Sequence, residues 1–150
     1  MNSNNFEKKK LEILELYKEK KFTEISKISS VLDKMYHDDY QLIYILGLTS
    51  INLKKYKEAE KYFKKLISVK KSHELYYIFG NIQKKLLKFD SAVSSFENAI
   101  KLNPNFSEAY NSLGNAKKSL DLNDEAELYY RKAIDLKEGN IEALFNLSNI

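Results

Sequence analysis

The sequence predicts an all-α protein built from repeated pairs of helices, and three observations support this fold class. The 150 residues include one proline and four glycines, so few residues interrupt helices. Apolar residues recur with the helical period and do not alternate as in a half-buried strand. A small residue also recurs every 33 or 34 residues, at Gly47, Gly80, Gly114 and Ser148. A period of this length predicts tandem units that each bury an apolar face against the next.

A glycine in the middle of a helix needs a physical reason, because it costs about 1 kcal/mol relative to alanine. Overpacking a larger side chain at a close helix contact costs about 1–3 kcal/mol, which favours glycine wherever two helices approach closely. We therefore expect the first helix of each unit to approach the second at its glycine. Alanines at matching offsets would receive the glycine and an aromatic residue would fill the space beside it; these residues are Ala59, Ala92 and Ala126, with Phe63, Phe96 and Tyr130.

Each unit reads as two helices joined by a short turn. The unit from Ser107 has the turn DLND, and its patterned residues are Tyr110, Leu113, Gly114, Ala126, Tyr130 and Ala133. Their spacing resembles the tetratricopeptide repeat (TPR), which has a 34-residue period and an L-G, A-x3-F and proline signature. The resemblance covers residues 40–72, 73–106 and 107–140. It implies a right-handed α-solenoid of stacked antiparallel helix pairs, the TPR superhelix, in which the first helices line a concave groove.

The two ends of the chain fit the repeat less well. Residues 1–39 are interpreted as a degenerate N-terminal helical pair that caps the array, since terminal units face solvent on one side. Phe22, Ile25 and Leu32 fall at repeat-like offsets there, but Ile13 occupies the glycine position. Residues 141–150 match the start of a further unit. We expect this unit to be truncated, with more repeats or another domain after Ile150.

The resemblance implies that the groove binds peptides or protein segments. Asparagine recurs at one groove offset, and its amide can donate to and accept from an extended backbone at once; tyrosine and phenylalanine would add apolar contact. The alternatives are that the asparagines only solvate the groove and that the N-terminal helices cover its apolar end. The predicted groove residues are Tyr44, Tyr77, Asn81, Lys84, Asn111, Asn115, Lys118, Phe145 and Asn149.

Three functions follow from this interpretation. The first is a non-enzymatic protein–protein interaction scaffold that binds an extended peptide or protein segment. The alternative is the N-terminal TPR arm of a larger enzyme, such as a glycosyltransferase or sulfotransferase, because the recurrent asparagines resemble the groove of O-linked N-acetylglucosamine transferases. The third is self-association through the apolar segment from Leu144 to Ile150.

One variant of the family grips the C-terminal carboxylate of chaperones through lysine, asparagine and arginine side chains on three consecutive units. This clamp does not map onto the present sequence. From the unit at His73 onward, its positions hold Tyr77, Asn81, Ser112, Glu142 and Asn146. We expect no tight binding of EEVD-type tails.

Composition argues against other partners. Net charge is +4, but 24 of the 25 basic residues are lysine and Arg131 stands alone, so the planar contacts favoured for base recognition are nearly absent and no nucleic-acid partner is expected. The longest near-continuous apolar run, Leu42 to Leu48, is far shorter than the roughly 20 residues of a membrane span. With no cysteine and no apolar core in the first ten residues, a cytoplasmic protein is expected.

Catalysis and metal binding have little support in the sequence. His37, Asp38 and Asp39 are titratable neighbours, but adjacent residues in a loop rarely converge on one ion. They are interpreted as a solvated turn. No glycine-rich phosphate loop or nucleophile motif occurs. We therefore expect no cofactor, no metal and no enzymatic activity.

Overall fold

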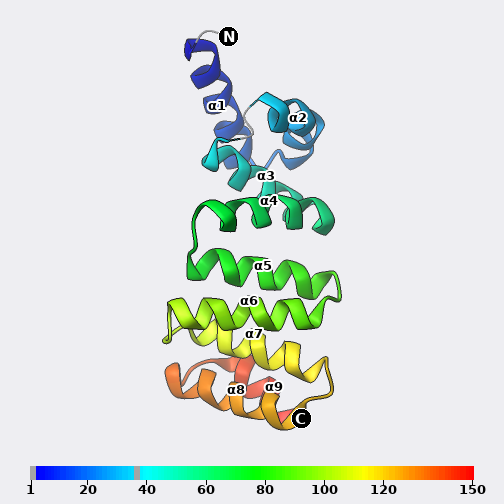
Figure 1. Ribbon diagram of the computed structural model, residues 1–150, viewed down its shortest axis with the longest axis vertical. Coiled ribbons are helices and arrows are strands. Elements are labelled where there is room, and N and C mark those ends of the chain that lie inside the picture. Colours follow the sequence, from blue (N-terminus) through cyan, green and yellow to red (C-terminus); the bar gives the residue numbers. More distant parts are fainter. Residues whose placement is uncertain (1–2, 36–37) are drawn as a thin grey trace. The chain divides into compact units, whose positions relative to one another are not determined.

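The computed structural model describes residues 3–35 and 38–150, and the described chain is helical with no β-strand (Figure 1). The all-α helical repeat fold expected from the sequence is confirmed. In chain order the helices are α1 (Ser3–Lys18), α2 (Phe22–Met35), α3 (Tyr40–Asn52), α4 (Tyr56–Val69), α5 (His73–Lys85), α6 (Phe89–Leu102), α7 (Ser107–Lys118), α8 (Asn123–Leu136) and α9 (Ile141–Ser148).

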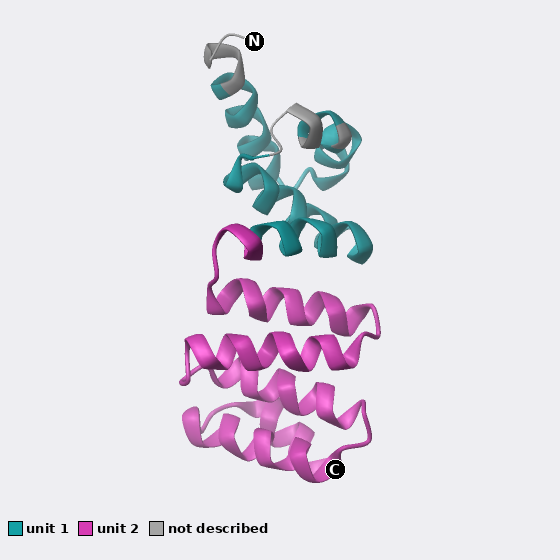
Figure 2. Cartoon of the chain, viewed as in Figure 1, with its two compact units in different colours: residues 1–66 teal, residues 67–150 magenta. Residues whose placement is uncertain are grey.

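The helices form two compact units, residues 1–66 and residues 67–150 (Figure 2). In the first unit, α1, α2 and α3 contact one another. In the second, α5 packs on α6, α6 on α7, α7 on α8 and α8 on α9, while α7 also contacts α5 and α9. The division falls within residues 40–72, the first predicted repeat.

In the three pairs that follow the N-terminal one, a glycine on the first helix packs against an aromatic ring on the second. A methyl group added at Gly80 would lie 2.6 Å from Cε1 of Phe96, and one at Gly114 would lie 2.6 Å from Cε1 of Tyr130. In the first unit, Gly47 stands 2.7 Å from Cε2 of Phe63 by the same measure. The three rings are fully buried. At Gly80 and Gly114 the nearest atoms belong to the ring, which the sequence had placed beside the contact, because only a residue without Cβ leaves room for it.

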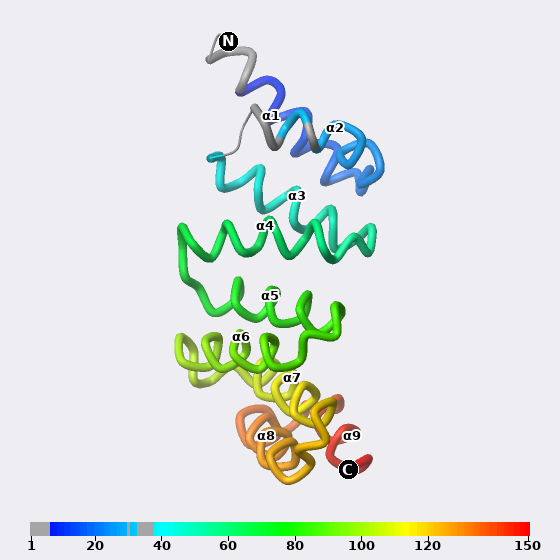
Figure 3. The backbone as a smooth tube through the Cα atoms, turned by 45° about the vertical axis from the view of Figure 1, so that its right-hand side comes forward, coloured from blue at the N-terminus to red at the C-terminus, as the bar shows by residue number. Residues whose placement is uncertain are grey.

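The turn inside each pair uses a left-handed residue at a constant position. Lys20, Lys54, Leu87 and Asp121 have φ angles of 58°, 58°, 59° and 60°. The next residue along donates its N–H back to the preceding helix, as Lys88 N does to Gln83 O at 2.9 Å. This bond satisfies a carbonyl at the end of the helix. Figure 3 shows the chain reversing direction between α5 and α6, where Leu87 lies. None of these four residues is glycine, so no glycine marks the shared conformation along the chain.

The N-terminal pair has the same turn, but the sizes of its residues at the two equivalent positions are reversed. In the other pairs the aromatic residue follows the glycine by 16 residues, as Phe96 follows Gly80. In the N-terminal pair the equivalent positions hold Ile13 and Ser29. Ile13 is fully buried and Ser29 is half-buried. The large residue thus stands on the first helix and the small one on the second, which is a volume-conserving exchange.

Replacing Gly114 with alanine is expected to destabilise the protein. The added methyl meets the buried Tyr130 ring, whose hydroxyl is held by Asn115 at 2.8 Å. Overpacking of about 1–3 kcal/mol outweighs the roughly 1 kcal/mol gain in helix propensity. We expect a net loss of up to about 2 kcal/mol in urea unfolding followed by circular dichroism. Gly139→Ala is the matched control, because no atom lies within 4 Å of its added methyl; equal losses in the two variants would contradict the ring contact.

Replacing Leu87 with glycine is expected to stabilise the protein. The left-handed conformation strains a residue with Cβ by about 1–2 kcal/mol, and glycine removes this strain. Glycine also raises the entropy of the unfolded chain, which cancels about half of the gained stability. The side chain is 74% exposed, so little packing is lost. We expect a gain of several tenths to about 1 kcal/mol in the same unfolding assay. Leu128→Gly, at an exposed position inside α8, should instead lose about 1 kcal/mol; a loss at Leu87 as well would exclude backbone strain there.

Candidate functional site

The second unit brings eight of the nine predicted groove residues onto helices that contact in series. Helix α7 touches both α5 and α9, and these three are the first helices of their pairs. Tyr44 lies on α3 in the first unit, half-buried, with its ring 5.9 Å from that of Phe63. The eight are Tyr77, Asn81 and Lys84 on α5, Asn111, Asn115 and Lys118 on α7, and Phe145 and Asn149 on and just after α9.

A cavity of about 270 Å³ lies where the N-terminal turns of α7 and α9 meet Tyr77 of α5. Two predicted groove residues, Tyr77 and Asn111, line it. The loop between α8 and α9 also lines the cavity and was not among the predicted groove residues, although Asn140 directly before a helix is a cap signature. The remaining lining residues are Glu108, Lys137, Gly139, Asn140, Ile141 and Glu142.

Tyr77 is held in place by other aromatic rings. Its ring centroid lies 4.9 Å from that of Phe106 and 6.0 Å from that of Phe96, and His73 contacts Phe106 edge-to-face at 5.3 Å. These contacts hold Tyr77 between the Phe96 ring, which packs on Gly80 in the same helix pair, and Phe106, which directly precedes the next pair. Tyr77 therefore forms a rigid wall of the cavity.

The recurrent asparagines bond within their own helix pairs. Asn81 donates its amide to Tyr77 O at 3.1 Å, and Asn149 donates to Phe145 O at 2.6 Å. Asn115 accepts from the Tyr130 hydroxyl at 2.8 Å. Each amide keeps further hydrogen-bonding capacity, because Asn offers two donors and two lone pairs. Their role in binding a partner stays a prediction.

Polar side chains tie α9 to α7 beside the cavity. Asn140 caps α9 by accepting from Ala143 N at 3.0 Å, and it donates to Ser107 Oγ at 2.8 Å. Ser107 in turn donates to Ala133 O at 2.8 Å. Further along the same two helices, Asn146 Nδ2 donates to Asn111 Oδ1 at 3.0 Å. These bonds fix the N-terminal turn of α9 that forms one wall of the cavity.

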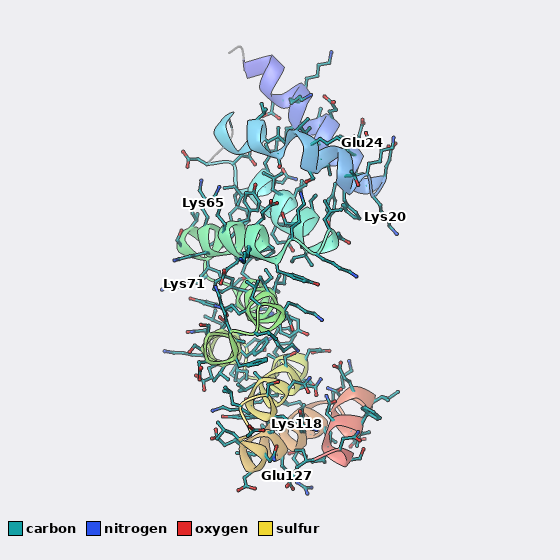
Figure 4. The ribbon with its side chains drawn as sticks, turned by 90° about the vertical axis from the view of Figure 1, so that its right-hand side faces the viewer. Lys20, Glu24, Lys65, Lys71, Lys118 and Glu127 are labelled. Carbon is teal, nitrogen blue, oxygen red and sulfur yellow. The ribbon has the colours of Figure 1, made fainter. Side chains whose placement is uncertain are left out.

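The two ends of helix α7 carry side chains of opposite charge. Glu108 stands in the first turn of α7, where its own backbone amide holds the pKa of the carboxyl below its usual value; desolvation opposes the shift, and Lys137 at 3.2 Å adds to it. Lys118 lies at the other end of α7 and donates to Asn149 O at 2.6 Å (Figure 4). Glutamates at N-termini and lysines at C-termini match the helix dipole. Helix α5 repeats the pattern with Glu74, Lys84 and Lys85.

Lys84 is the lysine most withdrawn from solvent on this face. Its side chain is half-buried, and burial lowers the pKa of its ammonium, with Glu142 partly opposing and Lys85 adding to the shift. It forms no hydrogen bond or ion pair with another residue in the described ranges. Lys84 thus presents a desolvated positive charge beside the carboxylate of Glu142.

The acidic turn before α3 has structural roles. Asp39 caps α3 by accepting from Leu42 N at 2.9 Å, and its carboxylate pairs with Lys10 at 2.8 Å. Asp38 lies 3.9 Å from Lys65. His37, the third member of the candidate cluster, lies outside the described residues. Among the residues that are described, no three His, Cys, Asp or Glu side chains are placed to hold a metal ion, and no helix has the length and apolarity to cross a membrane.

Known proteins share the repeat and the fold. The tetratricopeptide repeat profile matches residues 40–73, 73–106 and 107–140. Heat shock protein STI1 of Saccharomyces cerevisiae is 34% identical over 106 residues, which are 69% of this chain and 18% of the yeast protein. The chain therefore spans under a fifth of that relative.

Solved structures extend the similarity. The crystal structure of MamA superposes with a TM-score of 0.82 at 26% identity, covering 90% of this chain and 80% of that one. The first TPR of Spaghetti (RPAP3), bound to HSP90 peptide SRMEEVD, has a TM-score of 0.67 at 27% identity and covers 76% and 94%. The repeated matches, the glycine–aromatic contacts and these structures place this chain in the tetratricopeptide repeat family.

Proposed function

We propose that this chain is a non-enzymatic interaction module that binds an extended peptide segment across α5, α7 and α9. The observation that carries the proposal is the cavity bounded by these helices, with polar and aromatic side chains converging on it. The binding of HSP90 peptide by a structurally similar TPR domain supports the same class of ligand. The alternative of an arm of a larger glycosyltransferase or sulfotransferase stays a prediction.

Hydrogen bonds alone would not provide useful affinity. Each contributes about 0.5–1.5 kcal/mol net, whereas micromolar binding needs about 8 kcal/mol. Phe145 is 66% exposed on α9, and burying such a ring adds about 1.5–3 kcal/mol. The bound segment therefore places an apolar side chain on Phe145.

The ligand differs from the EEVD tails bound by the similar TPR domain. The resemblance to the family implies that such a tail would be held by cationic and amide groups, of which this chain keeps only the asparagine at Asn81. At two of the cationic positions stand Tyr77, packed among aromatic rings, and the carboxylate of Glu142. A carboxylate there repels an acidic tail. We propose that internal segments are preferred to acidic C-termini.

A peptide array probed with the labelled protein tests the function. Phe145→Ala is expected to weaken the bound peptides about tenfold, the equivalent of about 1.4 kcal/mol. Leu128→Ala, which removes a similarly exposed apolar side chain from α8, should leave binding unchanged. A peptide ending in EEVD should bind with Kd above about 100 μM in fluorescence anisotropy. Equal effects of the two substitutions, or tight binding of the EEVD peptide, would refute the proposed surface or its selectivity respectively.

The exposed apolar side of α9 favours self-association as a second function. Leu144 is 46% exposed and Ile150 45% exposed. Contiguous apolar surface of this kind is typical of protein contacts. We propose that a second copy of the chain covers it.

Light scattering across a range of protein concentrations tests this proposal. Leu144→Ser with Ile150→Ser is expected to convert a concentration-dependent dimer into a monomer, because it removes the apolar contact area. The control pair, Leu102→Ser with Leu128→Ser, changes two other exposed leucines and should leave the dimer intact. A wild-type protein that is monomeric at every concentration would exclude self-association.

A further inference from the structure

The cavity wall contains a carboxylate without an ion-pair partner. Glu142 lines the cavity from the first turn of α9 and forms no hydrogen bond or ion pair with the other described residues. The second carboxylate of the lining, Glu108, is already paired with Lys137 at 3.2 Å. A positive group that enters the cavity therefore meets Glu142 without breaking a hydrogen bond or a direct ion pair.

The cavity also contains a buried amide with an unused donor. Asn111 is 3% exposed, and its Oδ1 accepts from Asn146 at 3.0 Å. Its Nδ2 donates to no atom of the described residues, although Asn111 lines the cavity. The Nδ2 donor therefore keeps hydrogen-bonding capacity for a bound segment. A main-chain carbonyl of a bound segment would satisfy it.

An unpaired ammonium stands on the same face. Lys84 lies seven residues beyond Tyr77 on α5, so both side chains project from one side of that helix. The Lys84 ammonium interacts electrostatically with the Glu142 carboxylate, and burial removes part of the water around the ammonium. An acidic group beside Lys84 would restore the lost interactions of the ammonium.

These three groups define what the segment must carry, on the assumption that the proposed function holds. We propose that the bound segment is extended and bears a basic and an acidic side chain two residues apart, the basic one at Glu142 and the acidic one at Lys84, with a main-chain carbonyl accepting from Asn111 Nδ2. Alternate side chains of an extended chain point the same way, whereas adjacent ones point to opposite sides. The spacing of the two charges therefore matters as much as their presence.

Fluorescence anisotropy with four labelled octapeptides tests the inference. All four share an Ala-Ser background that is capped at both ends and carries one leucine, at the same position, for Phe145. One carries Arg-Ser-Glu, one the adjacent order Arg-Glu-Ser, and two replace either Arg or Glu of the first by Gln. At low salt we expect Arg-Ser-Glu to bind about threefold tighter than each of the other three, as suits partly exposed ion pairs. About 0.3 M salt should reduce the difference.

Substitutions assign each charge to its partner. Glu142→Gln should abolish the preference for Arg over Gln and keep the preference for Glu over Gln, and Lys84→Gln should do the reverse. Lys84→Arg should restore the preference for Glu, which separates lost charge from lost packing. The controls on α8, Glu127→Gln and Lys132→Gln, make the same charge changes and should alter neither preference; Figure 4 marks Glu127.

The outcomes separate this inference from the proposed function. Equal binding of all four octapeptides, or preferences that survive both substitutions, would overturn the charge pattern; the peptide array with Phe145→Ala would still decide the function. Failure of every octapeptide to bind while array peptides bind would also overturn it. Tighter binding of a peptide with two acidic residues would show instead that Lys84 alone selects the segment.

Discussion

The contact between a backbone without Cβ and a buried aromatic ring is the constraint on which the three repeat pairs depend. Gly80 and Phe96, and Gly114 and Tyr130, bring paired helices closer than any side chain at the glycine would allow. The resulting spacing sets how far apart successive first helices stand, since each pair packs on the next through α6 and α7 or α8 and α9. The dimensions of the face that carries the candidate site therefore depend on these buried contacts.

Successive pairs are joined by chemically different contacts at equivalent positions. Where the pair from His73 meets the next, an imidazole and the Phe106 ring pack edge-to-face. One unit later, Ser107 and Asn140 meet through a hydrogen bond. The hydrogen bond between Ser107 and Asn140 holds the loop before α9, which lines the cavity. The aromatic contact of Phe106 supports Tyr77, which also lines it. The cavity thus lies between one apolar and one polar junction, which explains why it presents both a ring and amide groups.

The spacing of glycines sufficed to predict the helical repeat because a residue that is unfavourable in helices has one common explanation when it recurs. The details that failed to follow from sequence depend on side-chain direction. Alanine and ring were both plausible neighbours of Gly114, and only the rotamer of Tyr130 decides between them. The left-handed turn at Leu87 carries no glycine to mark it. Asn111 has the same chemistry as Asn115, yet burial and the bond from Asn146 distinguish the two, and both come from residues distant in sequence.

The exchange of bulk in the N-terminal pair shows what the interface constrains. Ile13 and Ser29 keep roughly the combined size of a glycine and a ring while reversing which helix contributes it. In the pairs of this chain the combined size of the two positions is kept, and neither residue is specified alone. A lineage that moves between the two arrangements must pass through a sequence with either a void or a clash at this interface. Such a barrier would make the two positions change together. A sequence search that scores each position separately would therefore miss a helix pair that obeys the same rule.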